Sequence, residues 1–378
     1  MYKGFIRVAT GIPELKVTDC AFNVSKIAEL ARQAEAQKVQ VVCFPELSVT
    51  SYSCADLFYQ QQLYADIDNA LNELRMLTFT TTAALIVGLP VVIENQIFNC
   101  AAVIQGGHIL GIVPKTHLPN NNEFYEKRWF TEAAKATVNE IILAGETVPF
   151  GTDLLFGDAH FSFGIEICED LWVPIPPGTQ HALHGADVIF NLSASNELTG
   201  KHNYLCQLIE QQSARCISGY VYSSCGFGES TTDVVYGGNA IVAENGKIIA
   251  KSERFSIAAQ LIVSEIDVER LKADRLKNGN FSNLRTDKKY RHIKLEDAYF
   301  SKFEISRKFE KHPFVPSLTN RDAACGEIFS IQVNGLAKRW MHTKAETLVI
   351  GISGGLDSTL ALLVCVKTAD KLGFDRKR

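Results

Sequence analysis

One cysteine stands in a context that suits a nucleophile. Cys168 follows the apolar run 163–167 and precedes Glu169 and Asp170. The run predicts a strand, and the turn after a strand can expose a nucleophile with the next backbone N–H directed at an oxyanion. An unperturbed thiol is only about 3% ionised at pH 7. Cys168 therefore needs a base and a positively charged neighbour before it can attack a carbonyl carbon.

A carboxylate and an ammonium group occur at comparable strand ends. Glu46 follows the apolar run 41–45, and Lys115 follows the run 110–114. Together they would supply a general base for the thiol and a cation for the oxyanion of a tetrahedral intermediate. Either residue alone would be read as a solvated surface charge, so the interpretation depends on their joint occurrence with Cys168.

A glycine-containing segment near the C-terminus suits phosphate binding. It follows the apolar dipeptide Val349-Ile350 and leads into an apolar helix. Its glycines would let backbone N–H groups approach phosphate oxygens at a helix N-terminus, and Asp357 could reach a magnesium ion. The lysine of a Walker A motif is missing. The predicted loop consists of Gly351, Ile352, Ser353, Gly354, Gly355, Leu356, Asp357 and Ser358.

The elements that must position these residues alternate between strands and helices. Apolar strand-like runs are separated by helical segments such as 19–37, 63–80 and 201–215, and hairpins are expected around Gly106-Gly107 and Asn245-Gly246. This mixture predicts an α/β domain with two mixed sheets between helices. We place this domain at residues 1–275.

Two further segments follow. Residues 276–319 are charged and aromatic with weak periodicity, which favours a solvated linker. Residues 320–378 predict a helix over 321–342, a strand over 347–352, the glycine loop and a helix ended by Gly373. Because a parallel nucleotide-binding sheet needs several βα units, we expect this second domain to be truncated.

Composition excludes several classes of protein. The 378 residues are 46% hydrophobic and carry a net charge of −4, so no basic field indicates nucleic acid or anionic lipid. The longest apolar run is about half of what a bilayer requires. We therefore expect a cytoplasmic protein without membrane segments. Ten dilute cysteines indicate reduced thiols, and His181 and His184 are expected to face solvent rather than bind a metal.

The three strand-end motifs, in this order and spacing, resemble those of the nitrilase or carbon–nitrogen hydrolase superfamily. The resemblance covers about residues 1–275 and implies an αββα sandwich. It also implies that Cys168 is the nucleophile, Glu46 the proton acceptor and Lys115 the cation that stabilises the transition state. Glu123, in Asn122-Glu123-Phe124-Tyr125-Glu126, matches the additional glutamate that orients the site in this superfamily.

The glycine loop resembles the pyrophosphate loop of ATP-pyrophosphatases, which implies a Rossmann-like domain of the adenine nucleotide α-hydrolase type. A nitrilase-type domain followed by this loop is similar to the glutamine-dependent NAD synthetase family. That family implies glutamine, ATP and nicotinic acid adenine dinucleotide as ligands, ATP and magnesium in the second domain with Asp357 as a metal ligand, and no cofactor for glutamine hydrolysis. It also implies a homo-oligomer. The glutamine contacts carried over are Tyr52, Asn121, Glu169, Ser195 and Lys201.

Two alternatives remain open at this point. The chain could be a free-standing nitrilase-type amidase that acts on another amide, although the phosphate loop argues against this. It could also be a catalytically silent binding subunit in which Cys168 is structural, although the presence of both Glu46 and Lys115 argues against that.

Overall fold

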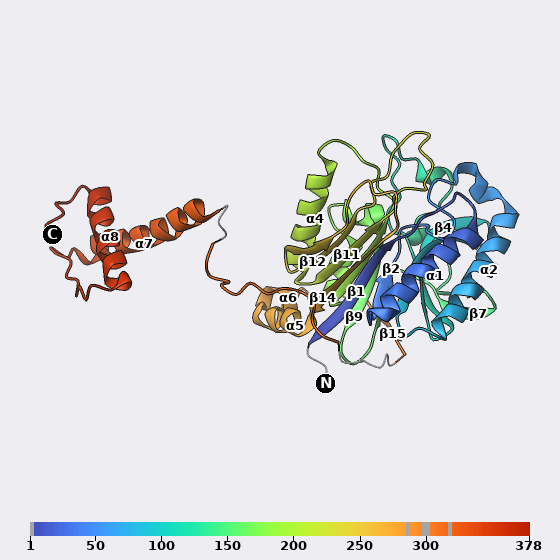
Figure 1. The fold of residues 1–378 in the computed structure, drawn as a ribbon, viewed down its shortest axis with the longest axis horizontal. Coiled ribbons are helices and arrows are strands. Elements are labelled where there is room, and N and C mark those ends of the chain that lie inside the picture. The colour runs from blue at the N-terminus through green and yellow to red at the C-terminus, as the bar shows by residue number, and fades with distance from the viewer. Residues whose placement is uncertain (1–3, 285–287, 297–302, 317–319) are drawn as a thin grey trace. The chain divides into compact units, whose positions relative to one another are not determined.

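The computed structural model describes residues 4–284, 288–296, 303–316 and 320–378. The chain forms two compact units, Met1–Arg307 and Lys308–Arg378, and each is described by itself. Mixed parallel and antiparallel sheets dominate the first unit (Figure 1).

A six-stranded sheet forms one half of the first unit. In spatial order its strands are β14 (Gln260–Asp267), β1 (Phe5–Ile12), β2 (Val41–Cys43), β3 (Ala84–Ile93), β4 (Gln96–Gln105) and β5 (His108–Pro114). The second sheet has seven strands: β13 (Lys247–Lys251), β12 (Ala240–Glu244), β11 (Gly219–Ser224), β10 (Val188–Ser193), β9 (Ser162–Ile167), β8 (Leu154–Gly157) and β15 (Arg291–Lys294). A small hairpin joins β6 (Glu140–Leu143) and β7 (Glu146–Pro149).

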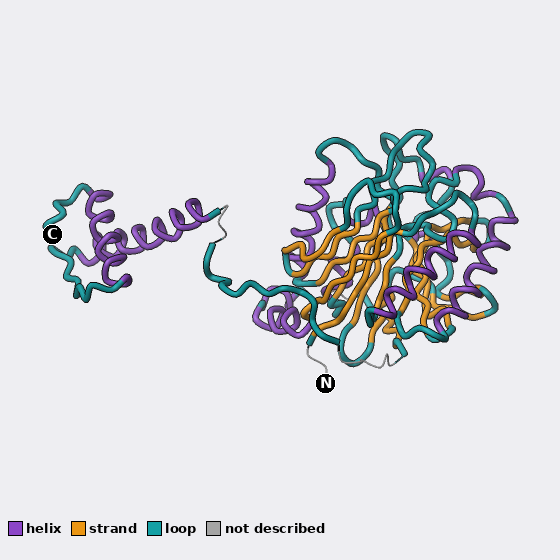
Figure 2. Tube along the Cα trace, in the orientation of Figure 1, coloured by secondary structure: helices purple, strands orange, loops and turns teal. Residues whose placement is uncertain are grey.

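The two sheets pack face to face, and helices cover their outer faces (Figure 2). Because strand side chains alternate between faces, Ile6 and Val8 of β1 join Phe163 and Phe190 of the second sheet in one buried cluster. On the outer faces, α1 (Cys20–Ala36) and α2 (Gln61–Thr78) pack on the six-stranded sheet. The seven-stranded sheet is covered by α3 (Pro177–Leu183) and α4 (Lys201–Cys216). The predicted αββα sandwich is confirmed.

Strand direction brings two of the three predicted catalytic residues, Glu46 and Lys115, to one edge of the six-stranded sheet. Strands β1, β2 and β3 are parallel, and β5 regains the direction of β3 because both β3–β4 and β4–β5 are antiparallel. Thus β2, which leads to Glu46, and β5, which leads to Lys115, end at the same edge of their sheet. Short 3-10 helices shape the loops: η1 (Ala55–Tyr59), η2 (Glu126–Arg128), η3 (Ala133–Lys135) and η4 (Cys168–Leu171).

The segment predicted as a solvated linker is in large part attached to the first unit. After α5 (Val268–Lys277) and α6 (Gly279–Asn283), β15 pairs in parallel with β8. Arg291 forms an ion pair of 2.6 Å with Asp153, and Arg307 forms one of 2.6 Å with the buried Glu244. These charges are held by carboxylates rather than by solvent alone. Residues 285–287, 297–302 and 317–319 of this segment lie outside the described residues.

The second unit contains α7 (Arg321–Thr343) and α8 (Leu356–Leu372). Val333, Ala337 and Trp340 of α7 are buried, as are Val364 and Ala369 of α8. Gly373 ends α8 at φ 68°, as predicted. The prediction of a strand over 347–352 is wrong: the described part of this unit contains no strand, because a strand forms only when a neighbour satisfies its backbone groups.

Candidate active site

Lys115 lies between two buried carboxylates. Its Nζ is 2.6 Å from Oε1 of Glu46 and 2.7 Å from Oε1 of Glu126, and all three side chains are shielded from solvent. Asn99 Nδ2 donates to Glu46 Oε1 at 2.7 Å, and the Tyr52 hydroxyl donates to Glu126 Oε1 at 2.8 Å. The result is a fixed ammonium group at the edge of the six-stranded sheet where β2 and β5 end.

The second carboxylate on Lys115 is that of Glu126, not that of Glu123, the glutamate that the sequence predicts to orient the site. Glu123 accepts a hydrogen bond from Asn196 Nδ2 instead, whereas Glu126 contacts Lys115. The N–H of Glu126 donates to Pro119 O at 3.1 Å, and η2 begins at this residue. This turn directs the Glu126 side chain inward. Both residues are glutamates in one short segment, so residue type alone held no signal that could separate them.

Burial and charge decide the protonation of this cluster. Although burial lowers the pKa of Lys115, the carboxylates of Glu126 and Glu46 outweigh it and raise that pKa above its ordinary value. Burial raises the pKa of Glu126 to about 7, against the opposing effect of Lys115. The lysine is therefore a permanent cation.

Cys168 occupies a strained turn at the end of β9. Its φ is 44°, in the left-handed region that costs a non-glycine residue about 1–2 kcal/mol. Its side chain is buried; burial, and to a lesser extent the charge of Glu46, raise the pKa of the thiol to about 12 against the opposing effect of Lys115. The resting thiol is thus protonated, and its attack on a carbonyl requires a base.

Glu46 has an oxygen available for that proton. Its Oε1 accepts from Asn99 and Lys115, while its buried Oε2 has no hydrogen-bond partner among the residues that the structure describes. A buried, unpaired carboxylate oxygen is costly unless a ligand or proton uses it. The arrangement can therefore perform nucleophilic catalysis with Glu46 as base and Lys115 as the oxyanion cation.

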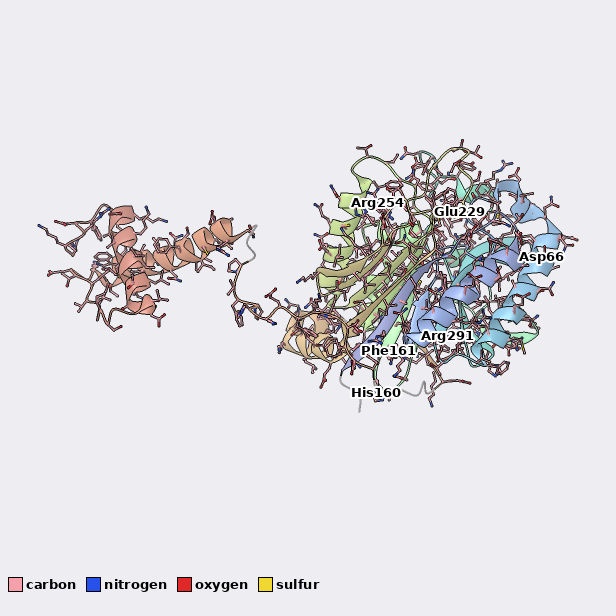
Figure 3. The ribbon with its side chains drawn as sticks, in the orientation of Figure 1. Asp66, His160, Phe161, Glu229, Arg254 and Arg291 are labelled. Carbon is pink, nitrogen blue, oxygen red and sulfur yellow. The ribbon has the colours of Figure 1, made fainter. Side chains whose placement is uncertain are left out.

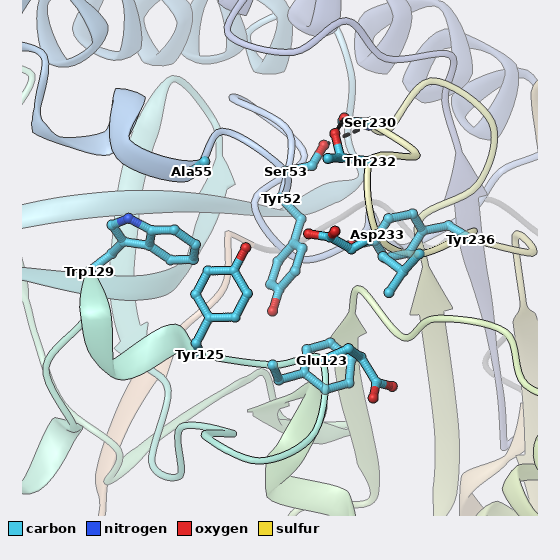
Figure 4. A pocket seen from close by; sticks show the side chains of 12 residues that line it. Tyr52, Ser53, Ala55, Glu123, Tyr125, Trp129, Ser230, Thr232, Asp233 and Tyr236 are labelled. Carbon is cyan, nitrogen blue, oxygen red and sulfur yellow. Dashed lines mark hydrogen bonds between the residues drawn. The ribbon is translucent and has the colours of Figure 1, made fainter.

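A cavity of about 150 Å³ adjoins this cluster. Tyr52 belongs to both, because it lines the cavity and hydrogen-bonds Glu126. Figure 4 shows the rings of Tyr52, Tyr125, Trp129 and Tyr236 around the cavity. The carboxylates of Glu123 and Asp233 also line it. Apolar walls with a few acidic groups suit a small substrate that carries a positive group.

One loop fixes the cavity wall. The buried Glu229 carboxylate accepts from Tyr52 N at 2.8 Å and from Ser53 N at 2.9 Å. Figure 3 places Glu229 at the end of the unit opposite His160 and Phe161, which precede β9. The site therefore lies at the end toward which β9 delivers Cys168.

The remaining predicted glutamine contacts differ in their burial and in their hydrogen-bond partners. Ser195 is buried, and Glu169 is half-buried within the electrostatic reach of Lys115 and Lys201. Lys201 Nζ donates to Asn196 Oδ1 at 2.6 Å. Asn121 differs: it is exposed, and its carbonyl accepts from Phe124 N, while Glu123, Phe124 and Tyr125 of that segment line the cavity.

The predicted phosphate loop is exposed at the start of α8. Gly354 has φ 82°, which a side chain would disfavour, and no atom lies within 4 Å of a Cβ built there. The hydroxyls of Ser353 and Ser358 are 3.3 Å apart, and Ser358 donates to Gly355 O at 3.0 Å. Asp357 lies in the first turn. The described residues contain no group of three or more metal-binding side chains.

One histidine prediction is wrong. His181 is buried, with Nε2 2.9 Å from Ile165 O and Nδ1 3.0 Å from the Tyr290 hydroxyl. Burial lowers its pKa to about 4. His181 thus packs beside β9 as a neutral residue. Its partner Tyr290 directly precedes β15, so the local sequence around His181 does not reveal this contact. His184 Nδ1 lies 2.7 Å from Gln180 O.

The fold and the Glu–Lys–Cys arrangement are both consistent with a carbon–nitrogen hydrolase. Residues 7–276 match the carbon-nitrogen hydrolase family model, and the chain belongs to that family. None of the described helices combines the length and apolar character needed to cross a membrane.

Individual relatives give a more specific similarity than the family model does. The chain is 37% identical over 389 residues to a glutamine-dependent NAD(+) synthetase of Mycobacterium tuberculosis, covering 99% of this chain and 56% of that protein. It is 27% identical to the corresponding Aquifex aeolicus protein, with 94% and 57% covered. The chain thus spans about half the length of the curated relatives it matches.

Solved structures agree on the fold. A glutamine-dependent NAD(+) synthetase from Cytophaga hutchinsonii matches with a TM-score of 0.62 at 24% identity, covering 98% of this chain and 53% of that one. An amidase from Nesterenkonia matches with a TM-score of 0.57 at 18% identity, covering 73% of this chain and 96% of that one.

Proposed function

We propose that this chain is the glutamine-hydrolysing part of a glutamine-dependent NAD synthetase. One observation carries the proposal: a buried lysine clamped by two carboxylates lies within electrostatic reach of a buried cysteine in a strained turn. The similarity to named NAD(+) synthetases over 99% of the chain supports glutamine as the amide.

The proposed reaction proceeds through a thioester. Glu46 takes the proton of the Cys168 thiol as sulfur attacks the side-chain carbonyl carbon of glutamine, and Lys115 stabilises the oxyanion. The C–N bond then breaks as Glu46 returns the proton to the nitrogen, which leaves as ammonia. Water attacks the thioester, Glu46 accepts its proton, and glutamate leaves as that proton returns to sulfur. No cofactor enters these steps.

We propose that the released ammonia serves an ATP-dependent amidation of nicotinic acid adenine dinucleotide to NAD in the whole protein. The residues at the start of α8 fit a nucleotide: Gly354 leaves room for phosphate, and Ser353 and Ser358 carry hydroxyl donors. Asp357 supplies a carboxylate of the kind that magnesium prefers. One solved structure that matches this chain is the Acinetobacter baumannii glutamine-dependent NAD+ synthetase in complex with ADP. Bound ATP would activate the acceptor carboxylate by adenylation. Homo-oligomer formation and a cytoplasmic location complete the proposal.

Ammonia and glutamate release from glutamine test the proposal. Cys168→Ala should abolish both products while leaving the melting temperature near that of the unmodified chain. Cys216→Ala removes another buried thiol, at the end of α4, and should retain activity. Glutaminase activity in the Cys168 variant would overturn the assignment. Preference for acetamide over glutamine would favour a simple amidase, the class of the Nesterenkonia neighbour.

A further inference from the structure

A third buried carboxylate lies between the two catalytic segments without touching Lys115. Asp170 belongs to η4, two residues after Cys168, and its side chain is almost fully shielded from solvent. Its Oδ2 accepts from Ile167 N at 3.0 Å, directly before the nucleophile. The same oxygen accepts from Thr116 N at 3.3 Å, and Oδ1 accepts from His117 N at 2.8 Å.

These bonds join two different sheets. Ile167 ends β9 of the seven-stranded sheet, whereas Thr116 and His117 follow β5 of the six-stranded sheet. One side chain thus ties the residue before Cys168 to the two residues after Lys115. Cys168 itself holds a left-handed φ of 44°, a conformation that persists only where surrounding contacts enforce it.

We propose that Asp170 is a positioning residue that fixes the Cys168 turn against the Lys115 strand end, and thereby sets the geometry of attack. The inference rests on the proposed function for its reaction but not for its geometry. Because a misplacement of about 1 Å can cost roughly 100-fold in rate, loosening this link should lower kcat rather than raise KM.

The substitution Asp170→Asn is a sharp perturbation. It keeps the size of the side chain but replaces one acceptor oxygen with an NH2 group that must face a backbone N–H. We expect Asp170→Asn to lower kcat at least 10-fold with KM within about twofold of the unmodified chain. Asp170→Glu retains both oxygens but displaces them by a methylene, and it should show the same split.

Asp187→Asn is the matched control. Asp187 is also buried and accepts a backbone N–H of β9, that of Ser162 at 3.0 Å, but at the opposite end of the strand. It also pairs with Lys272 and Arg275. This control should lower the melting temperature at least as much as Asp170→Asn does, while kcat stays within about twofold.

A second readout is independent of glutamine. Alkylation of Cys168 by iodoacetamide, followed by mass spectrometry, reports its reactivity, and the exposed Cys325 provides an internal reference. Asp170→Asn should slow alkylation at Cys168 several-fold and leave Cys325 unchanged.

The outcomes separate the two proposals. An unmodified chain that releases no ammonia from glutamine overturns the proposed function, whereas the alkylation rates still test Asp170. Unchanged kcat and unchanged or faster alkylation overturn the positioning role. A loss of activity in proportion to the loss of folded protein, in both Asp170 variants, would also overturn the positioning role, because it would indicate a purely structural residue.

Discussion

Replacement of Lys115 by methionine tests the electrostatics of the site most directly. Methionine keeps the length of the side chain but leaves Glu46 and Glu126, both fully shielded, without their shared cation. Breaking a buried ion pair by removing one partner costs about 3–5 kcal/mol. In a chain of this size that corresponds to a melting temperature lower by roughly 10 °C. Loss of the oxyanion cation should also lower kcat by about 100-fold or more.

The stability of the Lys115→Met variant should also depend on pH in a defined direction. Burial already raises the pKa of Glu126 to about 7, and loss of Lys115 removes the main opposing effect and raises that pKa further. The folded variant then binds more protons than the unfolded chain above the ordinary carboxyl pKa. Its stability should be greatest in acid and fall as the pH rises through 7.

Thermal melts at pH 5 and pH 8, together with a glutamate assay, measure both effects. Lys127→Met is the control, because Lys127 is half-exposed and pairs with Glu132 at the surface; such a pair contributes only about 0–1 kcal/mol. A Lys115 variant with near-normal kcat would refute the oxyanion role. One that melts no lower at pH 8 than at pH 5 would refute the reasoning about the buried carboxylates.

Three further predictions concern the remaining groups. Glu46→Gln, which removes the proton acceptor at nearly constant size, should lower kcat by about 100-fold; a change in KM alone would contradict the base role. Glu126→Gln should reduce kcat, whereas Glu123→Gln should act mainly on KM; steady-state kinetics that show the reverse would support Glu123, the glutamate predicted from the sequence, as the residue that orients the site. When ATP, magnesium and nicotinic acid adenine dinucleotide are added to the 378-residue chain, we expect no AMP or NAD and no change in the glutaminase rate. The reason is that the described part of the second unit holds two helices and no sheet. AMP or NAD above the enzyme-free control would disprove this prediction.

The proposed catalytic trio was accessible from sequence because strand ends are local features. Apolar runs predicted β2, β5 and β9, and the polar residue after each run was visible without any tertiary information. The glycine loop and its helix were equally local, and α8 begins within the predicted segment. Order and spacing of these motifs were enough to indicate the family.

What the sequence could not determine depended on contacts between distant segments. The choice of Glu126 over Glu123 follows from a turn that returns to Pro119, and the burial of His181 follows from Tyr290, 109 residues away. The strand predicted over 347–352 failed for the complementary reason: its local pattern was suitable, but the described residues of the second unit provide no strand that pairs with it. Residue types and local periodicity thus determined which groups are available for chemistry. Only the tertiary structure decided which of them meet, because burial, hydrogen-bond partners and the pKa of a buried group depend on the packing of the whole chain.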